Sequence, residues 1–258
     1  MLLVTWNVNS LKARMPRVLE LLAQHRPDAV CVQETKCAAE AFPHEALADA
    51  GYLAVDHSGG RWAGVAILAP MGAPLEDPRA GLPGEPDPDE ARWIEATVAG
   101  VRVASAYVPN GRAPGTPTFD AKLRFLDAMA GRAAELTGDG AAPVAIAGDL
   151  NVAPADIDVY DPSAFAGETH VTPPEREGLR RVLDAGLRDA YRELHPGEPG
   201  FTWWDYRQGH FHRGMGMRID LALLSPELAG RVRECGIDRD YRKGPKPSDH
   251  APLLVEIA

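Results

Sequence analysis

Residues 93–107 read WIEATVAGVRVASAY, and this stretch decides which class of fold the sequence adopts. Two apolar runs, 93–98 and 101–107, are separated only by Ala99 and Gly100, so they predict two strands joined by a tight turn. Strands joined in this way run antiparallel, and a purely parallel sheet with helical crossovers contains no such pair. The stretch therefore favours a mixed sheet.

Apolar runs on both sides of this hairpin predict further strands, at residues 2–8, 28–33, 52–55, 64–69, 144–147, 218–224 and 252–257. Amphipathic spacing predicts a helix that begins after Ser10, its N-cap, and further helices near 119–137 and 175–186. About nine strands with at least three helices indicate an α/β fold whose mixed core of two sheets is covered by helices.

Two stretches rich in turn-forming residues, 70–90 and 153–174, predict long surface loops. Neither is repetitive, and neither is flanked by self-sufficient units as a linker between domains would be. We found no internal repeat in the sequence. We therefore expect residues 1–258 to form a single domain.

The composition is that of an ordinary globular protein, with 45% hydrophobic and 25% charged residues among 258. No apolar run approaches the roughly 20 residues that span a bilayer, and the N-terminus lacks the basic region of a signal peptide, so we expect no membrane partner. Three cysteines without a CxxC pair fit a reducing compartment. These features predict a cytoplasmic location, and the abundance of Ala, Arg, Gly and Pro favours a bacterial cytosol and nucleoid.

The formal net charge of −10 argues at first against a nucleic-acid partner, because phosphate binding needs clustered bases. The charge is unevenly distributed, however. Residues 76–100 carry seven acids and two bases, whereas residues 203–250 carry nine bases and seven acids. The second segment can form a locally basic face, and a solvated surface of mixed charge is the alternative.

Polar residues recur where the predicted strands end. They are Asn7, Asn9, Glu34, Tyr107, Asn110, Asp149, Asn151, Asp220, Asp249 and His250. Taken singly, Asx residues at strand ends usually form turns. Together, carboxylates and amides from separate strands predict an oxygen-rich site for a hard cation such as Mg²⁺, with Glu34 as the first candidate ligand. A histidine beside one aspartate and oriented by another suits phosphoryl transfer.

Seven motifs then identify a family. They are TWNVNS (5–10), QETK (33–36), YVPNG (107–111), GDLNVAP (148–154), TWWDYR (202–207), RIDL (218–221) and SDHAP (248–252). In this order they closely resemble the exonuclease III type of abasic-site endonuclease. The resemblance implies a four-layer α/β/β/α sandwich with two mixed β-sheets face to face. It also implies a DNA-repair hydrolase that cleaves 5′ to abasic sites and has 3′–5′ exonuclease and 3′-phosphatase activity.

The resemblance also assigns roles to individual residues. It makes Glu34 the main metal ligand, with further contacts to the metal or its waters from Asn7, Asn9, Asp249, Asp149 and Asn151. It makes Asp149 the group that activates the attacking water, while Asn151 orients that water or holds the phosphate. His250 stabilises the transition state and Asp220 orients its ring. Tyr107 and Asn110 contact the phosphate, and an alternative role for Tyr107 is that of general acid.

Substrate contacts follow from the same resemblance. Trp203, Trp204 and Met217 match an apolar pocket for a flipped abasic sugar, with aromatic core packing as the alternative for the tryptophans. Lys122 and Arg92 lie in regions that match contacts to the DNA backbone, with solvated charge as the alternative.

The implied cofactor is Mg²⁺, with Mn²⁺ as the alternative, and one-metal and two-metal arrangements use the same ligands. The implied partner is double-stranded DNA with abasic sites or 3′ ends. For the oligomeric state, a monomer is the default expectation. Two other functions stay open. One is a phosphatase for a small phosphodiester or a phosphorylated lipid on the same fold. The other is a catalytically silent DNA-binding module, which is disfavoured because every chemical position holds a competent residue.

Overall fold

The hairpin of residues 93–107 forms as its sequence predicts. In the computed structural model, which describes residues 1–138 and 140–258, β6 (Trp93–Val98) pairs antiparallel with β7 (Val101–Tyr107). Ala99 and Gly100 in the turn both have positive φ, at 48° and 85°, as a tight two-residue turn requires. On its other side β7 pairs parallel with β8 (Val144–Asp149), so this sheet is mixed.

Two six-stranded sheets account for all the strands in the described residues. The other strands are β1 (Leu2–Asn7), β2 (Ala29–Gln33), β3 (Tyr52–His57), β4 (Val65–Pro70), β5 (Leu75–Ala80), β9 (Arg188–Asp189), β10 (Asp220–Leu224), β11 (Val232–Ile237) and β12 (Leu253–Ile257). The strand order is β11-β12-β1-β2-β4-β3 in one sheet and β5-β6-β7-β8-β10-β9 in the other.

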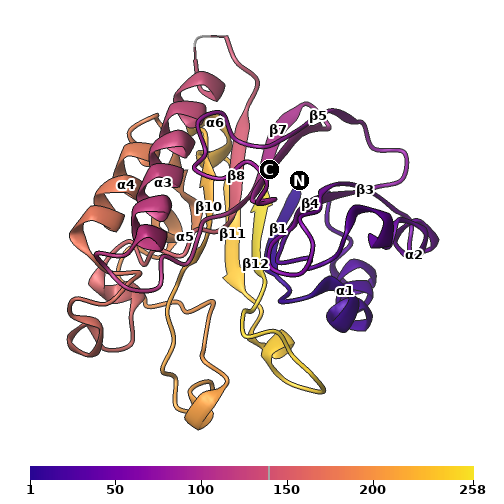
Figure 1. The fold of residues 1–258 in the computed structure, drawn as a ribbon. Helices are drawn as coiled ribbons and strands as arrows, with labels where there is room; N and C mark the ends of the chain where they lie inside the picture. The colour runs from indigo at the N-terminus through magenta and orange to yellow at the C-terminus, as the bar shows by residue number, and fades with distance from the viewer. Residues whose placement is uncertain (139) are drawn as a thin grey trace.

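Helices cover the outer faces of both sheets (Figure 1). The first sheet carries α1 (Leu11–His25) and α2 (His44–Asp49), and the second carries α3 (Pro117–Leu136) and α4 (Pro173–Leu183). The remaining helical segments are short: α5 (Ala190–Leu194), α6 (Pro226–Ala229) and the single turns η1 (Ala39–Ala41), η2 (Asp156–Asp158), η3 (Pro162–Phe165), η4 (Arg207–Gly209) and η5 (Arg239–Arg242). The four-layer sandwich with two mixed sheets is confirmed.

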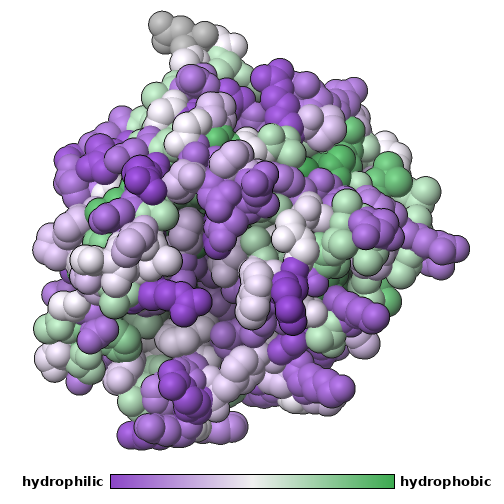
Figure 2. Space-filling model, viewed as in Figure 1, coloured by the Kyte–Doolittle hydropathy of each residue, from purple (hydrophilic) through white to green (hydrophobic). Residues whose placement is uncertain are grey.

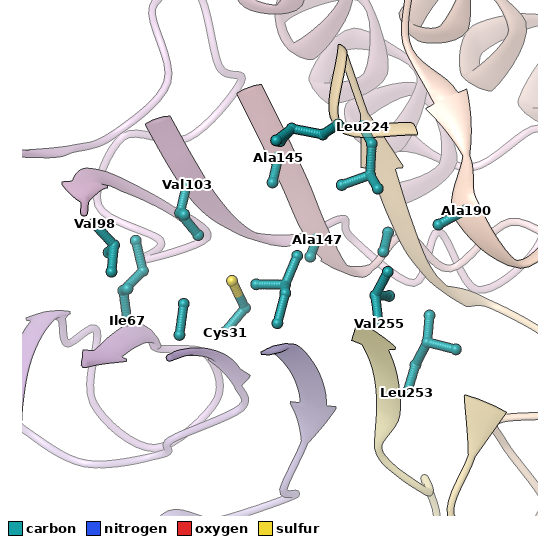
Figure 3. Packing of buried hydrophobic residues seen from close by; sticks show 14 of the residues in the cluster. Cys31, Ile67, Val98, Val103, Ala145, Ala147, Ala190, Leu224, Leu253 and Val255 are labelled. Atoms are coloured by element: carbon teal, nitrogen blue, oxygen red, sulfur yellow. The ribbon is translucent and has the colours of Figure 1, made fainter. Parts of the chain in front are cut away.

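The core between the sheets is built largely from small and β-branched side chains (Figure 3). Cys31 and Ile67 from one sheet face Val103, Ala145 and Ala147 from the other, and all five are at most 1% exposed. Alanines on the inner face let the sheets approach closely, and each buried branched side chain contributes about 1.5–3 kcal/mol. This packing holds the two sheets together face to face.

The predicted helix starts and stops are close to those observed. Ser10 caps α1 as expected, because its hydroxyl accepts a hydrogen bond from the Ala13 amide at 3.4 Å. Thr116 caps α3 in the same way through the Phe119 amide at 3.3 Å. The nine predicted strands are all present, with ends that differ by a few residues.

Three strands were not predicted, and one expectation is wrong. The stretch 70–90 is not a continuous loop, because β5 lies within it. β5 and β11 are edge strands in which five and three of the six residues are exposed, and β5 contains Pro78 beside a register shift. An edge strand buries only part of one face and tolerates proline, so its sequence lacks the apolar run that marks a central strand. β9 has two residues, too few for any pattern.

The surface agrees with the composition. Hydrophilic residues cover most of the face shown in Figure 2, with apolar residues scattered among them. Within the described ranges, no helix combines the length and the apolar character needed to cross a bilayer.

Candidate active site

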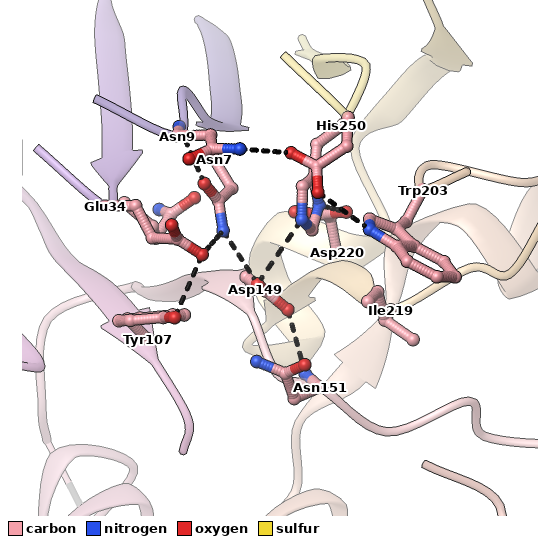
Figure 4. A network of polar contacts seen from close by, with 12 residues as sticks. Asn7, Asn9, Glu34, Tyr107, Asp149, Asn151, Trp203, Ile219, Asp220 and His250 are labelled. Atoms are coloured by element: carbon pink, nitrogen blue, oxygen red, sulfur yellow. Dashed lines mark hydrogen bonds and ion pairs between the residues drawn. The ribbon is translucent and has the colours of Figure 1, made fainter. Parts of the chain in front are cut away.

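The topology brings the polar strand ends to one edge of the two sheets. β1 runs parallel to β2, and β7 runs parallel to β8, so the carboxyl ends within each pair meet. β10 is antiparallel to β8 and places Asp220 opposite Asp149. Likewise β12 is antiparallel to β1, which brings the segment before it, including His250, back to the end of β1. Figure 4 shows these side chains pointing toward one another.

Glu34 receives hydrogen bonds from two side chains and forms an ion pair with a third. Asn7 Nδ2 and Tyr107 Oη donate to Glu34 Oε1, both at 2.9 Å, and Lys36 Nζ lies 2.6 Å from Oε2. Glu34 follows β2 with a φ of 54°, a left-handed conformation that a non-glycine residue adopts at a cost. This backbone bend turns the carboxylate toward the other sheet.

Asp149 lies at the centre of the network and is 2% exposed. Its Oδ2 accepts the second amide hydrogen of Asn7 at 2.9 Å and lies 3.7 Å from His250 Nε2, while Oδ1 accepts the backbone amide of Asn151 at 3.0 Å. Burial raises the pKa of Asp149 to about 7, and Asp220 contributes in the same direction against His250 and Asn7. A carboxylate with this pKa is suited to accept a proton near neutral pH.

His250 is held by a second carboxylate. Its Nδ1 donates to Asp220 Oδ2 at 2.8 Å, and Nε2 faces Asp149. Burial alone lowers the pKa of His250, but the carboxylates of Asp220 and Asp149 outweigh burial and raise this pKa to about 10. The imidazole is therefore positively charged at neutral pH, with its ring fixed by Asp220.

Asp249 belongs to the same network and lies between Asn9 and Trp203. It accepts hydrogen bonds from Asn9 Nδ2 at 2.9 Å and Trp203 Nε1 at 3.1 Å. Burial opposes ionisation, but His250 and these two donors together lower the pKa of Asp249. Asn9 Oδ1 in turn accepts from Lys36 Nζ at 2.7 Å. Lys36 is a site residue that was not singled out from the sequence, although it lies within QETK.

A second cluster flanks Asp149 on the side of β7. The exposed Asn110 donates through Nδ2 to Asn151 Oδ1 at 3.4 Å and lies 3.4 Å from His170 Nε2. Asn151 Nδ2 donates to the carbonyl of Val108 at 2.9 Å. His170 was not predicted, because it lies in an irregular segment with no periodic pattern and reaches the site through its backbone φ of 78°.

The donor set fits a hard divalent cation. Four carboxylates meet here, from Glu34, Asp149, Asp220 and Asp249, and the cationic side chains that pair with them are Lys36 and His250. Asp149 and Asp220 each place a carboxylate oxygen in a buried cluster with His250, whose atoms lie within 4.8 Å of one another. Asp220 Oδ1 is buried without a hydrogen-bond partner among the described residues. Excess negative charge on oxygen donors suits a divalent cation.

The structure corrects several expected substrate contacts. Lys122 is fully buried in an ion pair with Glu175, so the expectation that it contacts DNA is wrong. Trp204 is fully buried, so the expectation that it lines the apolar pocket is wrong. Met217 is 1% exposed and pairs with Trp203 through an isolated β-bridge, so its place in that pocket stays a prediction. Core packing is the correct interpretation of Trp204, whose ring meets Phe211 edge-on at 5.1 Å.

Two other expected contacts stay predictions. Trp203 is half-buried, and its hydrogen bond to Asp249 places it beside the site. Arg92 pairs with Glu90 at 2.5 Å, and its guanidinium lies 4.7 Å from the centre of the Tyr107 ring. Arg92 thus covers Tyr107 and keeps 11% of its side chain exposed.

Comparison with known proteins agrees with this geometry. Residues 4–250 match the Endonuclease/Exonuclease/phosphatase family. The exodeoxyribonuclease III of Haemophilus influenzae is 34% identical over 98% of this chain and 98% of its own. Among solved structures, the 3′ phosphatase NExo from Neisseria, bound to a product DNA hairpin, superposes with a TM-score of 0.95 at 39% identity. That match covers 100% of this chain and 99% of the other.

An AP endonuclease from Archaeoglobus fulgidus superposes with a TM-score of 0.94 at 35% identity, again over 100% of this chain and 99% of the other. The family resemblance inferred from the seven motifs is thereby confirmed. The chain belongs to the exodeoxyribonuclease III and AP endonuclease group of the Endonuclease/Exonuclease/phosphatase family, a family of hydrolases.

Proposed function

We propose that this protein is a Mg²⁺-dependent phosphoesterase that acts on double-stranded DNA at 3′ ends and at abasic sites. The observation that carries the proposal is a buried carboxylate that faces a protonated imidazole, with the pKa of both groups raised. Asp149, with its pKa raised to about 7, lies 3.7 Å from His250, with its pKa raised to about 10. One group accepts a proton at neutral pH, and the other carries a positive charge.

In this proposal Asp149 takes the proton of the attacking water. Asn7 holds one oxygen of this carboxylate and the Asn151 amide holds the other, so the carboxylate plane is fixed before substrate binds. His250 neutralises the negative charge that develops on the phosphate, and Asp220 keeps its ring oriented. Placing both groups in advance lowers the barrier because neither must reorganise during the reaction.

Tyr107 and Asn110 are the proposed phosphate contacts. Burial raises the pKa of Tyr107 well above its ordinary value, and the neighbouring Glu34 and Asp149 raise it further. A phenol with this pKa keeps its proton and serves as a hydrogen-bond donor, which favours phosphate contact over a role as general acid. Asn110 is exposed beside Asn151 and offers its amide to the same phosphate.

The residues assigned to the cation are Glu34, Asp249 and Asp149, with Asn7 and Asn151 as neutral oxygen donors. Mg²⁺ is the proposed ion and Mn²⁺ the alternative, since both prefer oxygen ligands. A bound Mg²⁺ would supply positive charge to a phosphoryl oxygen. Every one of these ligands comes from a single chain, which supports action as a monomer.

The substrate class follows from the relatives and from the corrected pocket. The relatives include an exodeoxyribonuclease III, a 3′ phosphatase bound to DNA and an AP endonuclease. Because Trp204 is buried, Trp203 and Met217 are the remaining candidates to contact an abasic sugar. We rank 3′ ends first and abasic sites second, because the 3′ phosphatase is 39% identical to this chain and the AP endonuclease 35%.

The test compares three end-labelled duplexes, one with a 3′-phosphate, one with an internal abasic-site analogue and one undamaged. Each is incubated with Mg²⁺ or with EDTA. Removal of the 3′-phosphate and stepwise loss of 3′ nucleotides, both abolished by EDTA, would support the proposal, and a single nick 5′ to the analogue would add the second activity. DNA left intact while a small phosphoester is hydrolysed would overturn the DNA assignment in favour of a small-molecule phosphatase.

A further inference from the structure

A fully buried ion pair contacts the backbone of Asn110 and Asn151, the two amide residues beside Asp149. Lys122 in α3 and Glu175 in α4 form this pair, and both side chains are 0% exposed. Lys122 Nζ also donates to the carbonyl of Asn151 at 2.6 Å and to the carbonyl of Asn110 at 3.1 Å. One ammonium group thus joins the segments that follow β7 and β8.

Glu175 holds a third segment to the same point. Its Oε1 accepts from Thr169 Oγ1 and from the His170 amide, both at 2.8 Å. Its Oε2 accepts from the Thr172 amide at 3.0 Å and the Thr172 hydroxyl at 2.6 Å. With Lys122 this carboxylate has five donors, so the segment 169–172 is tied to the ion pair at several atoms.

The packing of α3 against α4 does not require a charged pair such as Lys122 and Glu175. Two apolar side chains of similar volume would join the helices without the cost of removing two ions from water. What an apolar pair cannot do is hold two backbone carbonyls in place. Asn151 has a φ of 51°, a conformation that persists only where the surroundings determine it, and its carbonyl is the one that Lys122 contacts most closely.

The same arrangement fixes the state of His170. Its Nδ1 lies 2.6 Å from the Asn151 carbonyl, so Nδ1 carries the proton and Nε2 is left as an acceptor facing Asn110 Nδ2. In this tautomer Nε2 accepts from the Asn110 amide at 3.4 Å, which orients that amide.

We propose that Lys122 and Glu175 are positioning residues for the reaction: they hold Asn110, Asn151 and His170 in the arrangement that receives the phosphate. Neither side chain touches substrate. This inference rests on the proposed function for its catalytic readout.

The test uses the double variant Lys122→Met with Glu175→Gln, which leaves no unpaired buried charge. The control is Arg102→Met with Glu95→Gln, a second buried pair, located on β6 and β7, with side chains 9% and 2% exposed. No hydrogen bond links this control pair to a site residue. Both variants are assayed well below their melting temperatures, with circular dichroism to confirm that they are folded.

We expect kcat for release of a 3′-phosphate to fall about a hundredfold in the Lys122 and Glu175 variant, since a displacement of about 1 Å has that effect. KM should change little, and the control variant should retain kcat within about twofold. Restoring the charges with Lys122→Arg in the presence of Glu175 should recover part of the loss. Equal kcat in the two double variants would overturn the proposal.

A second readout does not depend on activity. The Asn151 side-chain amide donates to the Val108 carbonyl, so its NMR signals report whether this residue keeps its orientation. We expect these signals to shift or broaden in the Lys122 and Glu175 variant and to stay unchanged in the control. If the wild-type protein fails to act on DNA, this spectrum still decides whether the ion pair positions Asn151, and unchanged signals would refute the inference.

Discussion

Replacing Asp220 by asparagine tests the electrostatic pairing most directly. The substitution keeps the shape of a fully buried side chain and removes its charge from beside His250, whose Nδ1 lies 2.8 Å from Oδ2. Two unit charges about 4 Å apart interact by about 4 kcal/mol at an effective dielectric constant of about 20. At about 1.4 kcal/mol per unit, this loss lowers the pKa of His250 by about three units, from about 10 to about 7.

The expected pH profile follows from both partners of Asp220. At pH 8 only about a tenth of His250 would remain protonated in Asp220→Asn, so kcat should fall about tenfold there. Because Asp220 also raises the pKa of Asp149, the acid limb of the profile should move down as well. The whole bell-shaped curve is therefore displaced to lower pH.

The assay is kcat for 3′-phosphate release between pH 5 and pH 10, paired with an NMR titration of the His250 ring. Asp220→Ala serves as a comparison, because it removes the same charge and also leaves space behind the ring. A profile that loses amplitude but keeps its two limbs at their original pH would refute the electrostatic reasoning. Such a result would leave Asp220 a role in packing alone.

Three further outcomes are expected. Asp149→Asn should lower kcat about 10³-fold, a magnitude typical of a lost general base, while DNA affinity measured by fluorescence anisotropy stays within about threefold. Glu34→Gln should weaken Mg²⁺ binding at least about tenfold in calorimetric titration, and an unchanged affinity would remove it from the ligand set. Glu95→Gln should lower the free energy of unfolding at pH 7 by about 3 kcal/mol in urea, because it breaks a buried pair with Arg102 and Arg132. Burial opposes ionisation of Glu95, but the two arginines lower its pKa in the folded state below the value in the unfolded state. Its contribution to the free energy of unfolding is therefore present above the unfolded pKa and is lost as pH falls through the folded pKa. The difference between wild type and Glu95→Gln should therefore shrink on acidification.

The sequence predicted the central strands well because these strands are buried on both faces. Strands such as β2, with every residue buried, read as continuous apolar runs, and no surface requirement interrupts them. The edge strands β5 and β11 carry charged and exposed residues whose pattern does not differ from that of a loop. Each of these strands forms because a neighbouring strand, distant in the sequence or across a turn, offers hydrogen-bond partners. A short stretch of sequence contains no record of that neighbour.

The site residues at strand ends were predictable for a related reason. Once the strands are placed, residues such as Glu34 and Asp149 meet because the strand ends meet. Exposure is different, since it depends on partners far along the chain. Lys122 was expected at the surface. Its partners explain why it is buried: the Glu175 carboxylate, 53 residues away, and the carbonyls of Asn110 and Asn151. His170 has no local sequence signal, and its contacts with Asn110 and Asn151 identify it as a site residue.

The site lies across the seam between the two sheets, and this location explains a set of polar residues inside the core. Hydrophobic packing is not directional, so it does not by itself fix how far one sheet slides along the other. Gln33 Nε2 donates to Ser105 Oγ at 3.0 Å, and Ser105 Oγ donates to the Val32 carbonyl at 3.1 Å, which links β2 to β7 directly. Glu34 follows Gln33 directly in the sequence, and its carboxylate accepts a hydrogen bond from Tyr107 on the other sheet. The buried link therefore lies one residue from a site carboxylate. Directional hydrogen bonds in the seam therefore set the offset that lets side chains from both sheets form one site.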